Sequence, residues 1–313
     1  MGIAVVLFVI GVILIVKGGD YFVDAATWIA EISGIPKFVV GATVVSLATT
    51  LPELIVSSMA AAQGKVDMAI GNAIGSVTAN TGMIMSIGVF FMIPAMKRKK
   101  IAPKGILLMV TVVALWLLCT GGSLTTIESI IMLIIFGIFI IINIKEAKDG
   151  AAKNTDEKPE KNNKIIGINS LKFIFGAAGI VLGSQLLVDK GSFIAGELGV
   201  PEKVIALTAV AIGTSLPELV TTITAIVKKQ SSLSVGNIIG ANIIDCALIL
   251  PICAFISKGA IEVSKSTITI DMPVCALVIS IMIIPSLFTQ KFQRWQAILS
   301  FAIYIGYLAV VCM

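Results

Sequence analysis

Two acidic residues stand in the middle of long apolar runs, each directly after a proline. Glu53 lies in "SLATTLPELIVS" and Glu218 in "AIGTSLPELVTT", and hydroxyl-bearing residues precede both prolines. A proline inside a helix leaves one backbone carbonyl without its donor, so each run is expected to be broken or kinked there. Carboxylates, hydroxyls and freed carbonyls are hard oxygen ligands, which suit Ca²⁺ and also tolerate Na⁺.

A second pair of motifs follows. "GNAIGSVTAN" covers residues 71–80 and "GNIIGANIID" covers residues 236–245. Their glycines are expected to let neighbouring helices approach closely. A spacing of four residues places three side chains of each motif on one helix face: Asn72, Ser76 and Asn80 in the first, and Asn237, Ala241 and Asp245 in the second. These polar groups are expected either to face an ion or to hydrogen-bond between helices without a ligand.

Helix capping offers a competing explanation for the glutamates. Thr50-x-x-Glu53 and Ser215-x-x-Glu218 fit the capping box, in which a hydroxyl and a carboxylate satisfy a helix N-terminus. An ionised residue in mid-membrane costs at least ~2.5 kcal/mol on insertion scales, which a cap alone does not explain. The chain has no histidine, and no basic residue lies in either motif. The counter-charge is therefore expected to be a mobile cation, and capping and ion binding can coexist.

The composition places these motifs in a membrane. Of the 313 residues, 57% are hydrophobic and only 13% are charged, which is typical of a polytopic membrane protein because one span needs roughly 20 mostly apolar residues. The fold expected is an all-α integral membrane protein with ten transmembrane helices. The spans are predicted at about 3–17, with the first extending into the next stretch, and at 37–60, 68–94, 103–120, 124–144, 166–188, 202–227, 232–257, 266–287 and 296–312.

The chain repeats itself at a constant offset of 165 residues. "LPEL" at 216–219 falls on "LPEL" at 51–54, and "GNIIG" at 236–240 falls on "GNAIG" at 71–75. Each repeat holds five predicted spans, and an odd number makes the second repeat enter the membrane from the opposite side. Inverted repeats with discontinuous helices at a central site are the architecture of secondary transporters.

One long polar segment separates the repeats. Residues 145–165 carry many lysines and acids of nearly balanced charge, and we expect a flexible cytoplasmic linker. The halves are then 1–144 and 166–313. With both termini outside, only five of the 23 basic residues fall on the outer side, in agreement with the positive-inside rule: Lys65, Lys190, Lys203, Lys258 and Lys265. We therefore expect a multi-pass protein of the cell membrane.

The two motif pairs resemble those of the sodium/calcium exchanger family, in its prokaryotic form, within the cation/calcium antiporter superfamily. That family carries "G(T/S)SLPE" followed by "GN-x-x-GS" or a close variant, and the resemblance covers both repeats and the linker. It implies that Glu53 and Glu218 ligate calcium together with the backbone carbonyls of Thr49 and Thr214. It also implies one sodium site with Ser46, Thr49, Thr50, Ser76 and Glu218, a second with Ala211, Thr214, Ser215 and Glu53, and Asn80 with Asp245 at the centre.

Two residues depart from the family pattern. Ala241 stands where the family usually has the serine that mirrors Ser76, and Thr50 replaces a serine. The resemblance still implies a secondary antiporter that exchanges calcium for sodium by alternating access. A proton/calcium antiporter of the same fold is the first alternative, although that branch usually has a glutamate after its GN motif, and a passive cation channel is the second.

No sequence motif of an enzyme is present, so a transporter is expected rather than an enzyme. No cofactor is expected besides the transported Ca²⁺ and Na⁺, or H⁺. The expected partners are these ions and the lipid bilayer, without nucleic acid, and a monomer is expected to suffice for transport.

Overall fold

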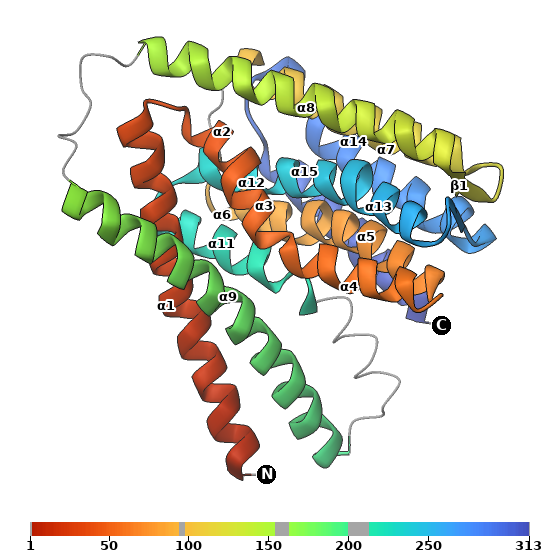
Figure 1. The fold of residues 1–313 in the computed structure, drawn as a ribbon, viewed down its shortest axis with the longest axis horizontal. Helices are drawn as coiled ribbons and strands as arrows, with labels where there is room; N and C mark the ends of the chain where they lie inside the picture. Colours follow the sequence, from red (N-terminus) through yellow and green to blue (C-terminus); the bar gives the residue numbers. More distant parts are fainter. Residues whose placement is uncertain (1, 94–97, 154–162, 200–212, 313) are drawn as a thin grey trace.

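The computed structural model describes residues 2–93, 98–153, 163–199 and 213–312 (Figure 1). The first half consists of α1 (Gly2–Ser33), α2 (Lys37–Val40), the π-helical η1 (Gly41–Val45), α3 (Ser46–Thr49), α4 (Leu51–Ala62), α5 (Val66–Ala79), η2 (Asn80–Met85), α6 (Ser86–Phe91), α7 (Arg98–Cys119), β1 (Ser123–Thr125) and α8 (Thr126–Lys153). The second consists of α9 (Asn163–Glu197), α11 (Leu216–Val227), α12 (Ser231–Ile244), η3 (Asp245–Ile249), α13 (Leu250–Ile256), β2 (Ala260–Glu262), η4 (Thr267–Asp271), α14 (Met272–Thr289) and α15 (Arg294–Cys312).

Eight helices within the described ranges are long and apolar enough to cross a membrane, or nine when one bent pair is counted as a span. A helical, multi-pass membrane protein is therefore confirmed. The bent pair is Lys37–Thr49 with Leu51–Ala62, which covers the predicted span 37–60. Of the predicted span 202–227, the structure describes only the part from residue 213, because 200–212 lie outside the described residues.

The first helix extends beyond residue 17, as predicted, and reaches Ser33. α1 continues to Ser33 and ends before Gly34, whose φ of 70° is a left-handed conformation that favours glycine. The apolar run ends at Lys17, but a helix need not end where its apolar run ends. Asp20 and Asp24 on this extension both pair with Lys228, at 3.4 and 2.7 Å.

Part of the predicted linker is helical. α8 runs on to Lys153, so residues 145–153 continue a membrane helix, and residues 154–162 lie outside the described residues. Two contacts hold this extension. The Glu146 carboxylate pairs with Lys104 on α7 at 2.8 Å, and Gly150 packs against Pro36 so closely that a Cβ there would lie 2.4 Å from the proline ring.

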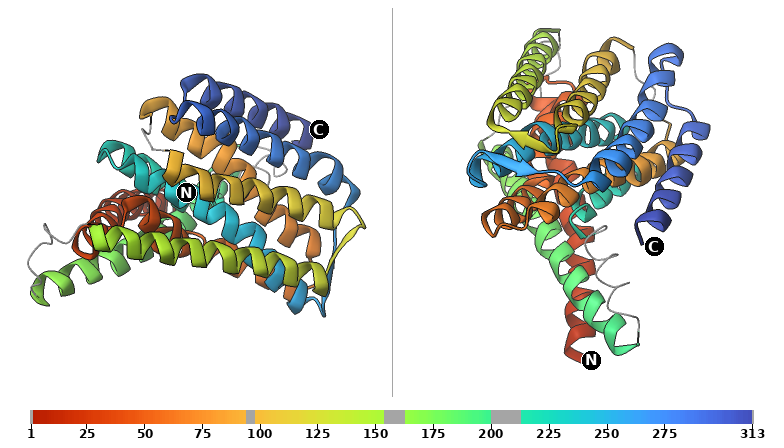
Figure 2. Two further views of the ribbon diagram at one scale, coloured as in Figure 1. Left: turned by 90° about the horizontal axis from the view of Figure 1, so that it is seen from above. Right: turned by 90° about the vertical axis from the view of Figure 1, so that its right-hand side faces the viewer.

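α1 and α9 lie side by side and project together from the helical body (Figure 2). Small residues allow this approach. A Cβ on Gly11 would lie 3.0 Å from the Gly183 carbonyl, and a Cβ on Gly18 would lie 2.9 Å from the Gly176 carbonyl. The offset of 165 pairs Gly11 with Gly176 and Gly18 with Gly183. The offset therefore converts the contact between Gly11 and Gly183 into the contact between Gly176 and Gly18. This reciprocal relation is the one that a local two-fold axis requires.

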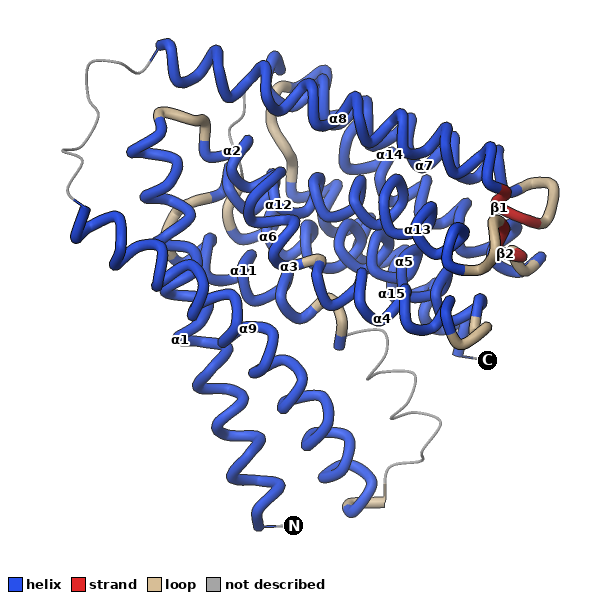
Figure 3. Tube along the Cα trace, viewed as in Figure 1, coloured by secondary structure: helices blue, strands red, loops and turns tan. Residues whose placement is uncertain are grey.

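A two-stranded antiparallel sheet is the exception to the all-α expectation. β1 and β2 pair with Ser123 opposite Glu262 and Thr125 opposite Ala260, at one end of the bundle (Figure 3). The sheet ties the α7–α8 connection to the chain that follows α13. Each strand has only three residues, too few for a recognisable alternating pattern, so the sequence did not predict it.

Candidate ion-binding site

The helix that carries Glu53 is broken just before it. α3 ends at Thr49, α4 begins at Leu51, and the helical segments on either side are bent by 45°. Pro52 sits in the first turn of α4, where its missing N–H sacrifices no bond within α4. The Ala48 carbonyl is left without the donor that a continuous helix would supply. The predicted break is confirmed.

The second proline motif has the same local structure. Thr214 and Ser215 form a turn, and α11 begins at Leu216 with Pro217 in its first turn. Ser215 is buried and Thr214 partly buried. Ala211 lies outside the described residues.

Neither hydroxyl forms the cap that the capping box requires. Thr50 Oγ1 donates instead to the Ser46 carbonyl at 2.6 Å, and Ser215 Oγ has no hydrogen-bond partner among the described residues. No side-chain cap bond is present at α4 or α11. The capping interpretation is therefore wrong, because neither hydroxyl accepts a hydrogen bond from a backbone N–H group of its helix.

Three carboxylates share the interior where the two halves meet. Glu53 is 1% exposed, and Glu218 and Asp245 are fully buried. All six carboxylate oxygens lack a hydrogen-bond partner among the described residues. Glu53 interacts electrostatically with both other acids, and Glu218 with Asp245. Like charges repel one another, so the arrangement favours a cation.

No protein cation lies among these acids in the described part of the chain. The one fully buried basic side chain there is Lys104, which pairs with Glu146 away from the site and lies 4.6 Å from the centre of the Phe38 ring. Within the same residues, no three acidic, cysteine or histidine side chains converge enough to hold a metal ion by themselves. A cation bound here must therefore also draw on neutral oxygens.

Threonine, serine and asparagine side chains supply such oxygens. The hydroxyls of Thr49 and Thr50 are close to the Glu218 carboxylate, although neither meets the geometry of a hydrogen bond. Thr49 Oγ1 donates to Asn237 Oδ1 at 3.2 Å, which joins the broken helix of the first half to α12 of the second. Glu218 thus lies near two hydroxyls from the opposite half.

Ser76, which is expected in one sodium site, lies against the second proline motif. Its hydroxyl is 3.4 Å from Thr214 Oγ1, a residue expected in the other sodium site. The two side chains come from different halves: Ser76 lies on α5, and Thr214 lies in the turn before α11. The structure therefore brings Ser76 to the junction of the halves, in contact with the second proline motif.

Asn80 and Asp245 begin two π-helical segments, η2 and η3, at positions that the repeat superimposes. Such wide turns in α-helices are frequent at functional sites. Asn80 Nδ2 donates to Asn242 Oδ1 at 3.1 Å, and Asn242 Nδ2 donates to Thr81 Oγ1 at 2.8 Å. This pairing leaves Asn80 Oδ1 without a partner among the described residues. Sequence reasoning missed Asn242, whose only signal was an amide in an apolar helix.

The close helix approach predicted for the glycines of both GN motifs is confirmed on α12 but is wrong on α5, where a Cβ on Gly71 or Gly75 would have no described neighbour within 4 Å. A Cβ on Gly236 would lie 2.3 Å from the Phe38 carbonyl, and one on Gly240 would lie 2.4 Å from the Ala42 carbonyl. These contacts press α12 onto α2 and η1 beside the first proline motif. Without side chains at these two positions, Asn237 can reach Thr49.

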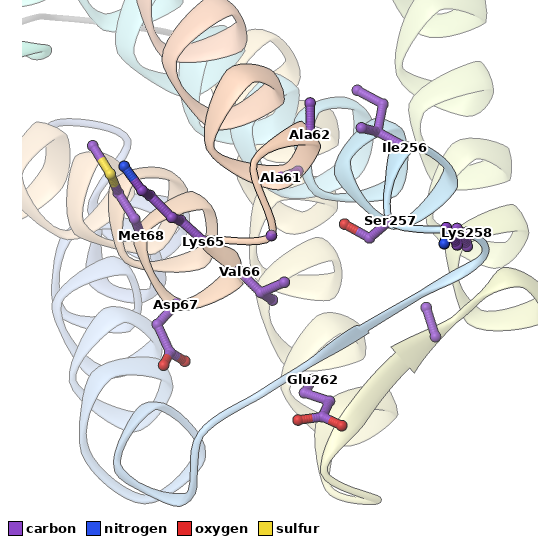
Figure 4. A pocket seen from close by; sticks show the side chains of 12 residues that line it. Ala61, Ala62, Lys65, Val66, Asp67, Met68, Ile256, Ser257, Lys258 and Glu262 are labelled. Atoms are coloured by element: carbon purple, nitrogen blue, oxygen red, sulfur yellow. The ribbon is translucent and has the colours of Figure 1, made fainter.

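A pocket of about 740 Å³ lies elsewhere, at the end of the bundle (Figure 4). It opens between the α4–α5 turn and the turn before β2. Its charged side chains are Lys65, Asp67, Lys258 and Glu262. None of the candidate site residues lines it, so the site is buried inside the bundle and separate from this surface pocket.

The family model for the sodium/calcium exchanger protein matches residues 3–145 and 169–313, each of which contains one proline motif and one GN motif. This chain belongs to the sodium/calcium exchanger family. Members of this family are secondary transporters, so the chain is a transporter and not an enzyme.

Similar proteins match this chain along most of its length. It is 33% identical to the inner membrane protein YrbG of Escherichia coli, over 84% of this chain and 82% of that protein. It is 28% identical to the sodium/calcium exchanger MaX1 of Methanosarcina acetivorans, over 97% of each. Its fold matches a solved structure of the sodium-calcium exchanger NCX_Mj, soaked with Na⁺ and Sr²⁺, with a TM-score of 0.85, 29% identity and 98% coverage of each chain.

Proposed function

We propose that this exchanger moves Ca²⁺ in one direction and Na⁺ in the other by alternating access. The observation that carries the proposal is the group of three buried carboxylates, Glu53, Glu218 and Asp245, whose oxygens have no hydrogen-bond partner among the described residues. A divalent cation, or sodium ions in its place, would supply the missing positive charge. The family membership supports cation antiport, and the choice of sodium as counter-ion is part of the proposal.

Calcium would be held mainly by Glu53 and Glu218, with the backbone carbonyls of Thr49 and Thr214. Sodium would use two flanking sets: Ser46, Thr49, Thr50, Ser76 and Glu218 in one, and Ala211, Thr214, Ser215 and Glu53 in the other. Asn80 and Asp245 would lie at the centre between them. Among the described residues, no three acidic side chains converge enough to hold a metal ion alone, which supports a coordination shell completed by neutral oxygens. Calcium takes six to eight oxygen ligands, so such a shell suits it.

The architecture proposed is two inverted five-helix repeats, ten spans in all, with domain limits at 1–144 and 166–313. The reciprocal contacts of Gly11 with Gly183 and of Gly18 with Gly176 support it, because a two-fold axis relates them through the repeat offset. An axis of this kind in the membrane plane would let the same interface open to either side.

The proposed location is the cell membrane, with both termini outside and the 145–165 segment in the cytoplasm. The placement of basic residues supports this orientation, since cytoplasmic connections carry an excess of lysine and arginine. One chain contains both halves of the site, so a monomer would suffice.

Flux measurements on the purified protein in liposomes test the counter-ion directly. An outward sodium gradient is expected to drive calcium uptake, and a proton gradient of equal size is expected to leave it at the level of empty liposomes. Uptake driven by the proton gradient alone would identify a proton/calcium antiporter. Calcium movement that follows the calcium gradient alone, without either counter-ion, would identify a channel.

A further inference from the structure

An apolar groove opens between α6 and α15, away from the ion site. It measures about 400 Å³, and its lining is almost entirely apolar: Ser86, Ile87, Phe90, Phe91, Ala297, Ile298, Phe301 and Ala302. Volumes of about 300–1,000 Å³ are usual for small-molecule sites. Phe91 and Ile298 are 68% and 58% exposed, so the groove faces the surroundings of the helical bundle.

The groove runs along the contact between the two helices. The aromatic side chains of Phe90 and Phe301 line it. Farther along α15, η2 packs tightly on this helix, since a Cβ on Gly82 would lie 2.8 Å from Tyr304 Cβ. An apolar groove between two helices fits a chain-like apolar ligand.

A cation stands beside the groove, in contact with Phe90 of its lining. Arg294, the first residue of α15, is exposed; its Nε donates to the Phe90 carbonyl at 3.2 Å and its guanidinium lies 5.8 Å from the centre of the Phe90 ring. Its two terminal nitrogens make no hydrogen bond within the described residues. Trp295 beside it is 48% exposed, and tryptophan is enriched at membrane interfaces.

We propose that this groove binds one phospholipid with an anionic headgroup, with an acyl chain between α6 and α15 and the phosphate on Arg294. Two observations favour this occupant over a bare hydrocarbon or a protein helix. The groove lining is apolar apart from Ser86, and the guanidinium of Arg294 lies beside it, next to an exposed tryptophan of the kind enriched at the interface, where a headgroup phosphate lies.

Charge, rather than apolar contact, would set the preference among lipids. An acyl chain leaves one apolar environment for another when it enters the groove, so shape alone gives little affinity. Arg294 would therefore select phosphatidylglycerol over phosphatidylcholine by about fivefold, the factor that corresponds to the ~1 kcal/mol each basic residue adds near an anionic membrane surface.

Native mass spectrometry of the full-length protein, released from bilayer discs of equal parts phosphatidylglycerol and phosphatidylcholine, tests the proposal. Arg294→Gln is expected to reduce the ratio of bound phosphatidylglycerol to phosphatidylcholine about fivefold, and Arg294→Lys is expected to keep most of it. Ala302→Trp, which fills the groove, is expected to reduce retention of both lipids. Lys229→Gln is the matched control, because it removes an exposed positive charge near the same end of α6 but outside the groove. Lys229 precedes Ser231 by two residues, and Ser231 and Met92, which follows α6, line the same small cavity.

An unchanged ratio in Arg294→Gln would overturn the anionic preference, and unchanged retention in Ala302→Trp would show that the lipids are only those that surround any membrane protein. Should Arg294→Gln fail to fold, as judged by size-exclusion chromatography, the comparison of Ala302→Trp with the wild type at two lipid compositions still decides the outcome. The readout is lipid retention, so it does not depend on the proposed ion exchange.

Discussion

Asn80 Nδ2 donates to Asn242 Oδ1 across 3.1 Å, from the π-helical turn of one half to α12 of the other. Asn242 in turn donates to Thr81, so its amide is fixed from both sides. The Asn80 amide is thereby oriented so that its Oδ1 atom has no hydrogen-bond partner among the described residues. Asn242 would thus position a ligand without touching an ion itself.

Replacing Asn242 by valine, the residue at the mirrored position 77, is expected to weaken calcium binding about 10–100-fold, the usual effect of losing a residue that orients a metal ligand. Calcium titration of the purified variant by calorimetry measures it. Asn143→Val is the control, because Asn143 is also a buried amide but bonds only to the Phe139 carbonyl of its own helix. Equal affinities of both variants would contradict the positioning role.

Removing either glutamate charge should abolish transport. Glu53→Gln and Glu218→Gln keep the side-chain volume, and calcium uptake into liposomes is expected to fall to the level of empty liposomes because the site loses half of its main charge. The stabilisation by calcium, about 2.7 kcal/mol at a concentration of one hundred times Kd, should also disappear from thermal unfolding curves. Glu262→Gln, in the outlying pocket, should change neither quantity. Normal uptake by either site variant would refute the assignment.

The packing of α1 on α9 should tolerate no side chain at Gly183. A Cβ there would lie 2.8 Å from the Gly11 carbonyl, so Gly183→Leu is expected to destabilise the protein by about 1–3 kcal/mol. Gly167→Leu on the same helix has no described neighbour within 4 Å of the added Cβ and serves as the control. Thermal unfolding in detergent compares the two, and equal midpoints would mean that the glycine contact carries no stability.

The orientation proposal can be checked by labelling. Thr155→Cys, in a Cys312→Ser background, and Met313→Cys should react with a membrane-impermeant maleimide from opposite sides, because the two residues flank five spans. The four other cysteines are buried and should stay unlabelled. Labelling of both positions from one side would rule out five spans in the second half.

The sequence predicted the features whose causes are local. A proline four residues beyond Ala48 removes a specific helical hydrogen bond, and an acid in an apolar run must be buried or paired wherever the run packs. The break before Glu53 and the burial of Glu53, Glu218 and Asp245 follow from those facts alone. The offset of 165 also predicted which motifs would be equivalent.

Features that depend on tertiary contacts were not predictable. The π-helical turns at Asn80 and Asp245 have different local sequences: Pro251 closely follows the second, and the equivalent position after the first holds Ser86. The extension of α8 to Lys153 rests on Glu146 meeting Lys104, 42 residues away. The capping pattern at Thr50 was present in the sequence, but the hydroxyl bonded the Ser46 carbonyl of the preceding turn instead.

The two proline motifs differ in what the facing helix offers them. Thr214 meets the Ser76 hydroxyl, 3.4 Å away, whereas the mirrored position on α12 holds Ala241, which is fully buried and has only a methyl group. Thr49 hydrogen-bonds Asn237 instead. The repeat thus keeps its backbone but loses one hydroxyl on one side of the site.

Ala241→Ser should restore that hydroxyl and raise the apparent affinity for sodium more than that for calcium. The reason is that calcium would rely mainly on Glu53 and Glu218, while a sodium ion on this side would otherwise keep few neutral oxygens. One added ligand is worth about 0.5–1.5 kcal/mol net, so the half-saturating sodium concentration is expected to fall roughly 2–10-fold. Sodium-dependence curves of calcium flux measure this, with Ala247→Ser, a buried alanine on η3, as the control. Superimposed curves for Ala241→Ser and the wild type would mean that Ala241 only packs.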